Sequence, residues 1–558
     1  MIRIDQLKCA PSKDDKGLIK AVSRKLGIRK EDILELGIIR KSLDARKKPE
    51  LFNVYSVWVR TENDEKILKK LRKDASVSVF SPVLYKAPEG GNEKLTHRPV
   101  ITGMGPAGLF CAYELALRGY KPLIIERGRS VEERKNDVKR FWETGVLDTI
   151  SNVQFGEGGA GTFSDGKLAT SVKDKDGRIH EVLKIFSDNG APFDILYEQM
   201  PHLGTDILPG IVKSIREKII ENGGEVRFET KLTGIAMNDG RVVSVTVTDR
   251  EGAQEEIPCE VLILATGHSA RDTYKMLYDN GLKMEQKPFA AGFRVQHPQK
   301  MIDLDRYGSY EAAELLGASP YKVTANFEDR GVFSFCMCPG GYVVNASSEE
   351  GELCVNGMSY SGRDSANANS AIVVSIPVSE YPSDHPLAGI EYQRNLEKRA
   401  YDLAQGRIPA QRYGEFKDAV IKTENSSVSS EASDDGCRGE GFEPVFKGEY
   451  EWCDLTGIFD EKINRLFVDG MTSFAHTIRN FDAPEVIMAG VESRTSSPVR
   501  ILRDGNLEAS VPGIYPLGEG AGYAGGITSA AADGLRGAES IIRKYSPLEQ
   551  NTDRSVRV

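Results

Sequence analysis

Hydrophobic and polar residues follow two different periods along the first 88 residues. Alternation with a period of two occurs in "MIRIDQLKCA", "IIRKSLDAR", "LFNVYSVWVR" and "VSVFSPVLY", and it predicts four strands. Two segments with a helical period, "KGLIKAVSRKLGI" and "NDEKILKKLRK", separate these strands. The order β-α-β-β-α-β predicts a ferredoxin-like α+β domain, with two helices packed on one sheet.

A different pattern begins after the turn-rich segment 86–99, which predicts a linker. The apolar "RPVIT" runs into Gly103, Gly105 and Gly108, a helical pattern follows, and a second strand, "KPLIIERG", contains Glu126. The spacing G-x-G-x-x-G inside a complete βαβ unit predicts a dinucleotide site. The three glycines allow the tight turn, the approach of a pyrophosphate and the packing of helix on strand. Glu126 is placed to accept hydrogen bonds from ribose hydroxyls.

The same glycine spacing occurs twice more. In "FGEGGAGTFSDGKL", which starts at Phe155, a polar and glycine-broken segment follows, so no second dinucleotide fold is predicted there. An alanine at Gly156 is therefore expected to be tolerated much better than a valine at Gly105. In "LGEGAGYAGGITSAAADGL", which starts at Leu517, a helix follows, but only a short polar tail remains after Tyr545. That segment predicts a closing strand, an acidic turn and a terminal helix.

Several longer motifs carry a resemblance to a known family. The segments "GTDIL", "LATGHSARDTY", "FRVQHPQ", "CPGGYVVNAS", "VNGMSYSGRDSANANSAIVV" and "GVESRTSSPVR" resemble bacterial FAD-dependent, or NAD(FAD)-utilising, dehydrogenases of unassigned substrate, within the glutathione-reductase-type flavoproteins. The resemblance covers nearly the whole chain. It implies an α/β fold with a Rossmann FAD domain that is discontinuous in sequence and carries an inserted substrate or cap domain. The predicted domains are a basic ferredoxin-like domain (1–88), the first part of the FAD domain (97–287), the cap (288–477) and the closing part of the FAD domain (478–545).

The resemblance, together with the βαβ unit, assigns the residues that bind FAD. They include a glycine-rich loop beside the flavin and a terminal helix whose N-terminus faces the flavin pyrimidine. The predicted set is Gly103, Gly105, Pro106, Ala107, Gly108, Glu126, Arg127, Gly158, Gly159, Ala160, Gly161, Lys167, Lys231, Ala265, Thr266, Gly267, Gly518, Glu519, Gly526, Ile527 and Thr528.

Candidate catalytic residues come from the cap and from the segments just before and after it. Arg294 and Arg494 offer planar guanidinium groups that bind a carboxylate or phosphate through two oxygens. His297 and His268 offer side chains that titrate near neutral pH and can act as general acids. For each of these residues the alternative is a structural ion pair or a satisfied buried histidine. No metal site is expected, because the cysteines show no zinc-ligand spacing.

These features predict an FAD-dependent oxidoreductase that transfers hydride to or from a small organic substrate, with NAD(P)H as a transient electron donor. Two alternatives stay open: a flavin-dependent RNA-modifying enzyme, and a flavin-bearing electron-transfer or partner-recognition protein. The first 88 residues favour them, since 21 Lys and Arg against 12 Asp and Glu leave this segment at +9 and the rest of the chain at −18. Such a domain captures an acidic partner, binds nucleic acid or docks on the acidic body of its own chain.

Two further features concern location and thiol chemistry. No apolar run approaches the roughly 18 residues of a membrane helix, and the charged N-terminus lacks a secretory signal, so a cytoplasmic protein without membrane contact is expected. Among eight cysteines, Cys336 and Cys338 in "FSFCMCPGG" lie on alternate positions of a predicted strand and point to one face. They are either buried structural thiols or redox-active ones.

Overall fold

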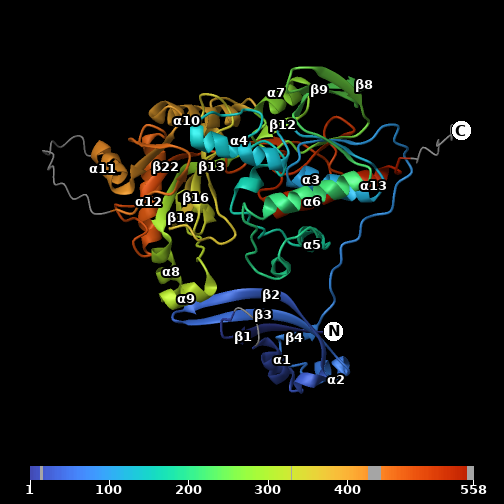
Figure 1. Cartoon of the computed structure of the whole chain (residues 1–558), viewed down its shortest axis with the longest axis vertical. Helices are drawn as coiled ribbons and strands as arrows, with labels where there is room; N and C mark the ends of the chain where they lie inside the picture. Colours follow the sequence, from blue (N-terminus) through green and yellow to red (C-terminus); the bar gives the residue numbers. More distant parts are fainter. Residues whose placement is uncertain (13–16, 329, 425–440, 549–558) are drawn as a thin grey trace.

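The chain forms an N-terminal sheet, a parallel sheet and a large mixed sheet. The structure is a computed structural model, and it describes residues 1–12, 17–328, 330–424 and 441–548. Figure 1 shows the N-terminal sheet lying against the two larger bodies, with the linker running as an extended segment along one edge of the molecule to the parallel sheet. No helix among the described residues is both long and apolar enough to cross a membrane.

The N-terminal sheet has the strand order β2-β3-β1-β4, and its neighbouring strands are antiparallel. Ile4, Val57 and Val59 lie on the face that α1 covers and are fully buried. The elements are β1 (Ile2–Cys9), α1 (Leu18–Leu26), β2 (Ile33–Lys47), β3 (Glu50–Thr61), α2 (Asp64–Lys70) and β4 (Val77–Val79). The chain thus has the β-α-β-β-α-β order that the alternating pattern indicates.

The parallel sheet has the order β24-β11-β5-β6-β7. Its strands are β5 (Val100–Thr102), β6 (Leu123–Ile125), β7 (Glu225–Arg227), β11 (Leu262–Leu264) and β24 (Ile514–Pro516). The surrounding helices are α3 (Pro106–Leu117), α4 (Val131–Thr144), α5 (Arg178–Asp188), α6 (Leu208–Glu221), α7 (Arg271–Asp279) and α13 (Ile527–Lys544). Helices α3, α5, α6 and α13 pack on one face of this sheet. A three-stranded sheet of β8 (Thr230–Asn238), β9 (Arg241–Asp249) and β10 (Gln254–Pro258) covers the opposite face.

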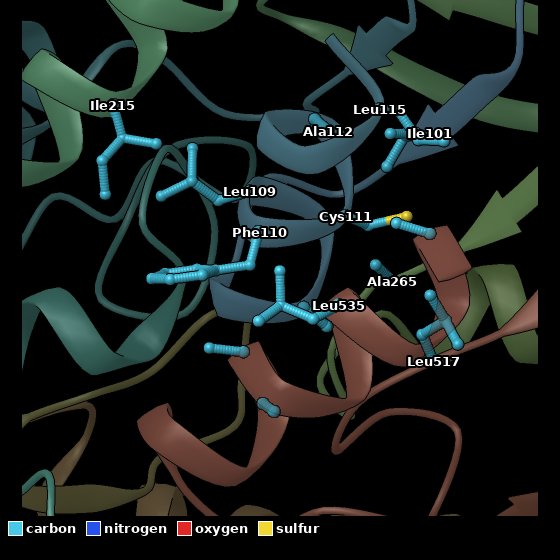
Figure 2. Close-up of a cluster of buried hydrophobic side chains, with 14 of the residues drawn as sticks. Ile101, Leu109, Phe110, Cys111, Ala112, Leu115, Ile215, Ala265, Leu517 and Leu535 are labelled. Carbon is cyan, nitrogen blue, oxygen red and sulfur yellow. The ribbon is translucent and has the colours of Figure 1, made fainter. Parts of the chain in front are cut away.

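Helices α3 and α13 pack closely on the parallel sheet, although more than 400 residues separate them in sequence. Figure 2 shows Phe110 of α3 beside Leu535 of α13, and Cys111 of α3 on the side of the helix where Ile101, Ala265 and Leu517 lie. Gly534 of α13 makes the close approach possible, because a Cβ there would lie 2.2 Å from the Ala107 carbonyl oxygen. Helix α13 therefore completes the body that the parallel sheet forms with its helices, in which the predicted dinucleotide site lies (the nucleotide body), and brings its own N-terminus next to that of α3.

The third body is a seven-stranded sheet of order β14-β15-β18-β13-β22-β19-β21. Its strands are β13 (Phe289–Pro298), β14 (Thr324–Phe327), β15 (Arg330–Cys338), β18 (Asn367–Ile376), β19 (Ile408–Arg412), β21 (Tyr450–Trp452) and β22 (Ile487–Glu492). Its helices are α8 (Gln299–Tyr307), α9 (Tyr310–Leu316), α10 (Ala388–Ala404), α11 (Tyr413–Glu424) and α12 (Glu461–Ala475). Three smaller strands, β16 (Tyr342–Asn345), β17 (Val355–Met358) and β20 (Phe446–Lys447), form a separate sheet, whereas β12 (Met284–Gln286) and β23 (Val499–Ile501) pair with each other and pack in the core of the parallel-sheet body.

The return to the nucleotide body comes later than the predicted boundary at residue 477. Strand β22 pairs with β13 and β19, and Ile478, Phe481 and Val486 are buried in the core of the third body. Residues 478–492, predicted to close the FAD domain, therefore belong to the third body, which corresponds to the predicted cap, and β22 is a strand of its sheet. The predicted boundary is wrong here because β22 forms its hydrogen bonds with strands that are distant in sequence.

The basic N-terminal body docks on the acidic remainder through β2. The Lys41 backbone N–H donates to the Tyr197 carbonyl at 2.8 Å, the Gln199 N–H donates to the Lys41 carbonyl at 2.9 Å, and the Lys41 ammonium lies 3.1 Å from the Glu198 carboxylate. The Lys48 ammonium contacts Asp305 of α8. Some of the basic residues of this body thus form ion pairs with acidic residues of the same chain.

Reversing the charge at this contact tests the docking. In Lys41→Glu two carboxylates would face each other, and we expect a loss of about 1 kcal/mol of docking free energy, or roughly fivefold faster proteolysis of linker 86–99. The double variant Lys41→Glu/Glu198→Lys should restore most of the protection. The matched control Arg40→Glu alters an exposed neighbour on the same strand. Equal proteolysis rates for Lys41→Glu and Arg40→Glu would contradict this account of the docking.

Candidate functional site

The first glycine turn joins β5 to α3, and two of its glycines serve the protein's own packing. Gly103 has a φ of +93°, and a Cβ there would lie 2.4 Å from the Ala265 carbonyl oxygen. At Gly108 a Cβ would lie 2.0 Å from the Gly103 carbonyl oxygen. Gly105 differs, since the nearest atom to its added Cβ is the Gly159 Cα at 3.9 Å. The protein alone leaves space in front of Gly105, and that space is part of a cavity.

Glu126 follows β6, and its carboxylate forms hydrogen bonds with three separate backbone turns. Its carboxylate accepts hydrogen bonds from the backbone N–H groups of Met104 at 2.8 Å, Gly128 at 2.9 Å and Gly156 at 3.0 Å. The side chain is buried and also lines the cavity. A carboxylate has about four acceptor positions, so three backbone bonds leave one for a ligand hydroxyl. The predicted ribose contact is thus compatible with the structure, but the larger role of Glu126 is to join the two glycine-rich segments.

The loop 155–161 folds back over the first glycine turn. The Gly158 N–H donates to the Met104 carbonyl at 2.9 Å, and Gly159 lies against Gly105. Gly156 has a φ of +124°, and a Cβ there would lie 2.4 Å from Cδ of Arg134. The expectation that Gly156→Ala would be mild is therefore wrong, since both the backbone conformation and the arginine exclude a side chain.

Arg134 of α4 is the residue that holds this loop, and sequence reasoning missed it. Its guanidinium is fully buried and lies over the Phe163 ring. It donates to five backbone carbonyls at 2.7–3.2 Å, those of Asn152, Val153, Gly156, Glu157 and Gly159. Burial lowers the pKa of Arg134 to about 10, so the group still carries its charge at neutral pH. In sequence Arg134 is one charged residue of a polar helix, and nothing local distinguishes it from its neighbours.

A cavity of about 380 Å³ runs along these segments and reaches the cap. It is bounded by the first glycine turn, the end of β6, the loop 155–161, the end of β11 and the start of α13, and from the cap side by Phe335, Cys336 and Asn356. The structure brings most of the predicted residues together here: Gly103, Gly105, Pro106, Ala107, Glu126, Arg127, Gly159, Ala160, Gly161, Lys167, Lys231, Ala265, Thr266, Gly267, Glu519, Gly526, Ile527 and Arg494.

Four predicted cofactor residues lie behind the cavity wall. Gly108 packs on the first turn, and the Gly158 N–H is used by Met104. The Gly518 N–H donates to the Asp533 carboxylate at 2.8 Å, and the Thr528 hydroxyl donates to the Leu168 carbonyl at 2.7 Å. These residues shape the wall rather than face the cavity.

Arg294 and His297, two predicted catalytic residues, are fully buried in the cap and do not line the cavity. The Arg294 guanidinium binds the Glu492 carboxylate through two bonds of 2.9 and 3.1 Å. His297 Nε2–H donates to the Phe481 carbonyl at 2.9 Å, and burial lowers the pKa of His297 to about 4. The structural alternative is the better description of both, because neither side chain has access to a ligand.

The third catalytic candidate, Arg494, reaches the cavity but is held by other groups. Its guanidinium binds the buried Glu397 carboxylate through bonds of 3.0 and 2.7 Å and donates to the Ser348 hydroxyl at 2.6 Å. His268 also lines the cavity, and its Nδ1 lies 3.1 Å from the Glu519 carboxylate. Of the residues considered for acid–base chemistry, His268 is the titratable side chain placed at the cavity.

The end of the cavity near the cap combines a helix N-terminus with a cation. Gly525, Gly526 and Ile527 line it where α13 begins, so the free N–H groups of this helix are directed toward it. The Lys167 ammonium also lines this end and lies 3.6 Å from the Asp165 carboxylate. A group that acquires negative charge would be stabilised there by the helix dipole.

Comparisons with known proteins agree with an FAD site. Residues 288–495 match the family described as FAD-dependent protein, C-terminal domain-like, and residues 1–60 match a domain of unknown function (DUF8436). An uncharacterized protein of Clostridium beijerinckii is 42% identical over 550 residues, which cover 98% of this chain and 99% of that protein.

Solved structures give weaker similarities. The E. coli quinol fumarate reductase subunit FrdA aligns with a TM-score of 0.35 at 11% identity, over 81% of this chain and 70% of that one. A flavoprotein/dehydrogenase from Cytophaga hutchinsonii aligns with a TM-score of 0.31 at 12% identity, over 80% and 78%. These TM-scores are too low to support an inference about the reaction.

Removing the guanidinium of Arg134 tests its role in the loop. Arg134→Leu would leave buried carbonyls without donors, and we expect a loss of about 3 kcal/mol or more in the free energy of unfolding. Hydrogen exchange of residues 152–159 should accelerate even where the rest of the protein stays protected. Arg140→Leu is the matched control, because this half-exposed arginine of the same helix contacts Asp137 at 3.4 Å and no loop carbonyl. Similar exchange in the two variants would show that Arg134 does not organise the loop.

Proposed function

We propose that this chain, which belongs to the same family as the uncharacterized Clostridium beijerinckii protein, is an FAD-dependent oxidoreductase that acts on a small organic substrate. One observation carries the proposal. A single cavity extends from the glycine turn of the βαβ unit to the region that matches an FAD-dependent C-terminal domain, and residues of both line it. A dinucleotide cofactor and a substrate would therefore meet at the boundary between the two bodies.

The residues present fit the extended shape of FAD. The open space in front of Gly105 and the N-terminus of α3 suit a pyrophosphate, which needs close backbone approach and unpaired N–H groups. Glu126 has an acceptor position left for an adenosine ribose at one end. At the other end the start of α13 and Lys167 suit the pyrimidine edge of a flavin.

When bound, flavin supplies the exchange of a hydride or of electrons with the substrate. The protein's own contribution is electrostatic and steric. The N-terminus of α13 and the Lys167 ammonium would stabilise the negative charge of a reduced ring. Phe335 and Thr495 line the cavity on the cap side, where the Phe335 ring would shield the reacting atoms from water.

A second cavity of about 460 Å³ adjoins the first and favours an apolar substrate part. The two cavities share Phe335 and Thr495 in their walls. The remaining lining of the second is largely apolar and includes Pro288, Phe289, Ala290, Phe333, Ile376 and Pro377. We infer that the substrate reaches the flavin from this side and that its apolar portion lies against Phe333 and Phe335.

Cofactor analysis tests the proposal. The purified protein should be yellow and release intact FAD on heating, because the βαβ unit provides a site for an adenosine that FMN lacks. Gly105→Val should fold, as judged by circular dichroism, but lose FAD, since the added methyl groups occupy the cavity. Gly210→Val is the control, because no atom lies within 4 Å of its added Cβ. Release of FMN alone, or full FAD retention by Gly105→Val, would refute the assignment.

A further inference from the structure

Two thiols lie at the end of β15, on the cap side of the cavity. Cys336 is partly exposed and lines the cavity, whereas Cys338 is fully buried behind it. The Cys338 thiol donates to the Cys336 carbonyl at 3.3 Å. Only Met337 separates the two cysteines in sequence, and the Cys338 thiol also forms a hydrogen bond with the Cys336 side chain. The pair therefore has one sulfur accessible from the cavity and a second sulfur within reach of the first.

The strand is irregular at this point. The register between β15 and β18 shifts between Phe335 and Cys338, and Cys336 has a φ of +44°. A positive φ is uncommon for a residue other than glycine, and such conformations concentrate at functional sites. The bulge changes the direction of the chain, and Cys336 lines the cavity together with Lys167.

The buried Arg294 holds the strand end in this arrangement. Its guanidinium donates to the Cys336 carbonyl at 3.1 Å and to the Asn369 side chain at 2.8 Å, and it lies 3.9 Å from the Cys338 sulfur. The Glu492 carboxylate neutralises it from the opposite side. Arg294 is thus a positioning residue for the thiols, which explains a buried arginine that has no access to a ligand.

The two thiols also differ in acidity. The hydrogen bond from Cys338, followed by the charges of Lys167 and Arg294, lowers the pKa of Cys336 below its usual range, although burial and Glu492 oppose this. Burial, together with Cys336 and Asp165, raises the pKa of Cys338 well above its usual range. The thiol on the cavity side is therefore the more acidic of the two, and the thiolate is the reactive form of a cysteine.

We propose that Cys336 and Cys338 form a redox-active pair that exchanges two electrons with the flavin bound in the cavity, an inference that rests on the proposed function. Formation of the S–S bond from the two thiols releases two electrons and two protons, which pass to the oxidised flavin. In the reverse direction the same two electrons and two protons cleave the S–S bond. The step balances with the flavin as its partner.

The thiol chemistry is tested first by alkylation of the full-length protein. Peptide mass spectrometry with iodoacetamide should show Cys336 reacting with a midpoint at a lower pH than Cys453, because the thiolate is the nucleophile and the pKa of Cys336 is lowered. Lys167→Met should raise that midpoint, since it removes a cation that favours the thiolate. Cys453, a partly exposed thiol outside the cavity whose pKa is raised by burial, is the internal reference. A Cys336 midpoint at or above that of Cys453 would overturn the proposal.

The electron count is tested by anaerobic dithionite titration of the oxidised holoprotein. Wild type and Cys453→Ser should take up about four electrons per FAD, and Cys336→Ser and Cys338→Ser about two, because the disulfide is a two-electron couple. Mass spectrometry should find the Cys336–Cys338 disulfide in oxidised protein, with or without flavin. A flavin-bound wild type that takes up only about two electrons overturns this inference and leaves the proposed function standing, whereas a protein without flavin overturns the proposed function itself.

Discussion

The structure of the candidate site depends on one buried cation. The guanidinium of Arg134 binds carbonyls from residues 152–159, a loop whose glycines provide no side chains with which to fix its conformation. The Glu126 carboxylate complements it, since it accepts the N–H of Gly156 from this loop and the N–H of Met104 from the first turn. Two opposite charges thus fix two glycine-rich segments against each other, with bare backbone lining the space between them. Side chains in either segment would fill that space.

A second set of buried charges joins the cap to the nucleotide body. Arg271, at the start of α7, binds Glu349 at 2.6 Å, Glu352 at 2.9 Å and Glu397 at 2.7 Å. Arg494 binds Glu397 from the other side at 2.7 Å. Burial and the neighbouring carboxylates raise the pKa of Glu352 to about 8, so this group takes up a proton more readily than an exposed glutamate. A buried network of this kind sets the relative position of two bodies, because removing one member leaves the remaining buried charges less well compensated.

These two networks explain why the cavity is continuous between the bodies. Arg134 sets the position of the loop on one side, and the Arg271 cluster sets the position of the cap on the other. Phe335 and Cys336 then line the same cavity as Ile527, although they belong to the seven-stranded sheet and Ile527 belongs to a helix of the nucleotide body. The oxidoreductase chemistry that we propose requires this geometry, since flavin, substrate and thiols would have to meet without intervening water.

The sequence by itself determined the features that depend on neighbours along the chain. The spacing of Gly103, Gly105 and Gly108 and the position of Glu126 follow from one βαβ unit, whose turn and helix form within about 25 residues. The alternation in the first 88 residues indicated the order of the N-terminal strands in the same way. Local backbone sterics and side-chain periodicity are sufficient for such features.

The tertiary structure alone decided what depends on contacts between distant segments. Arg134 looks like any charged helix residue until the loop 152–159 folds around it, and Gly156 looks like a turn glycine until that arginine occupies its side-chain space. His297 reads as a candidate acid until Phe481 covers it, and β22 joins the cap sheet only through its pairing with β13. Burial and partner identity are set by packing across the whole chain, and the residue pattern of a single segment does not contain them.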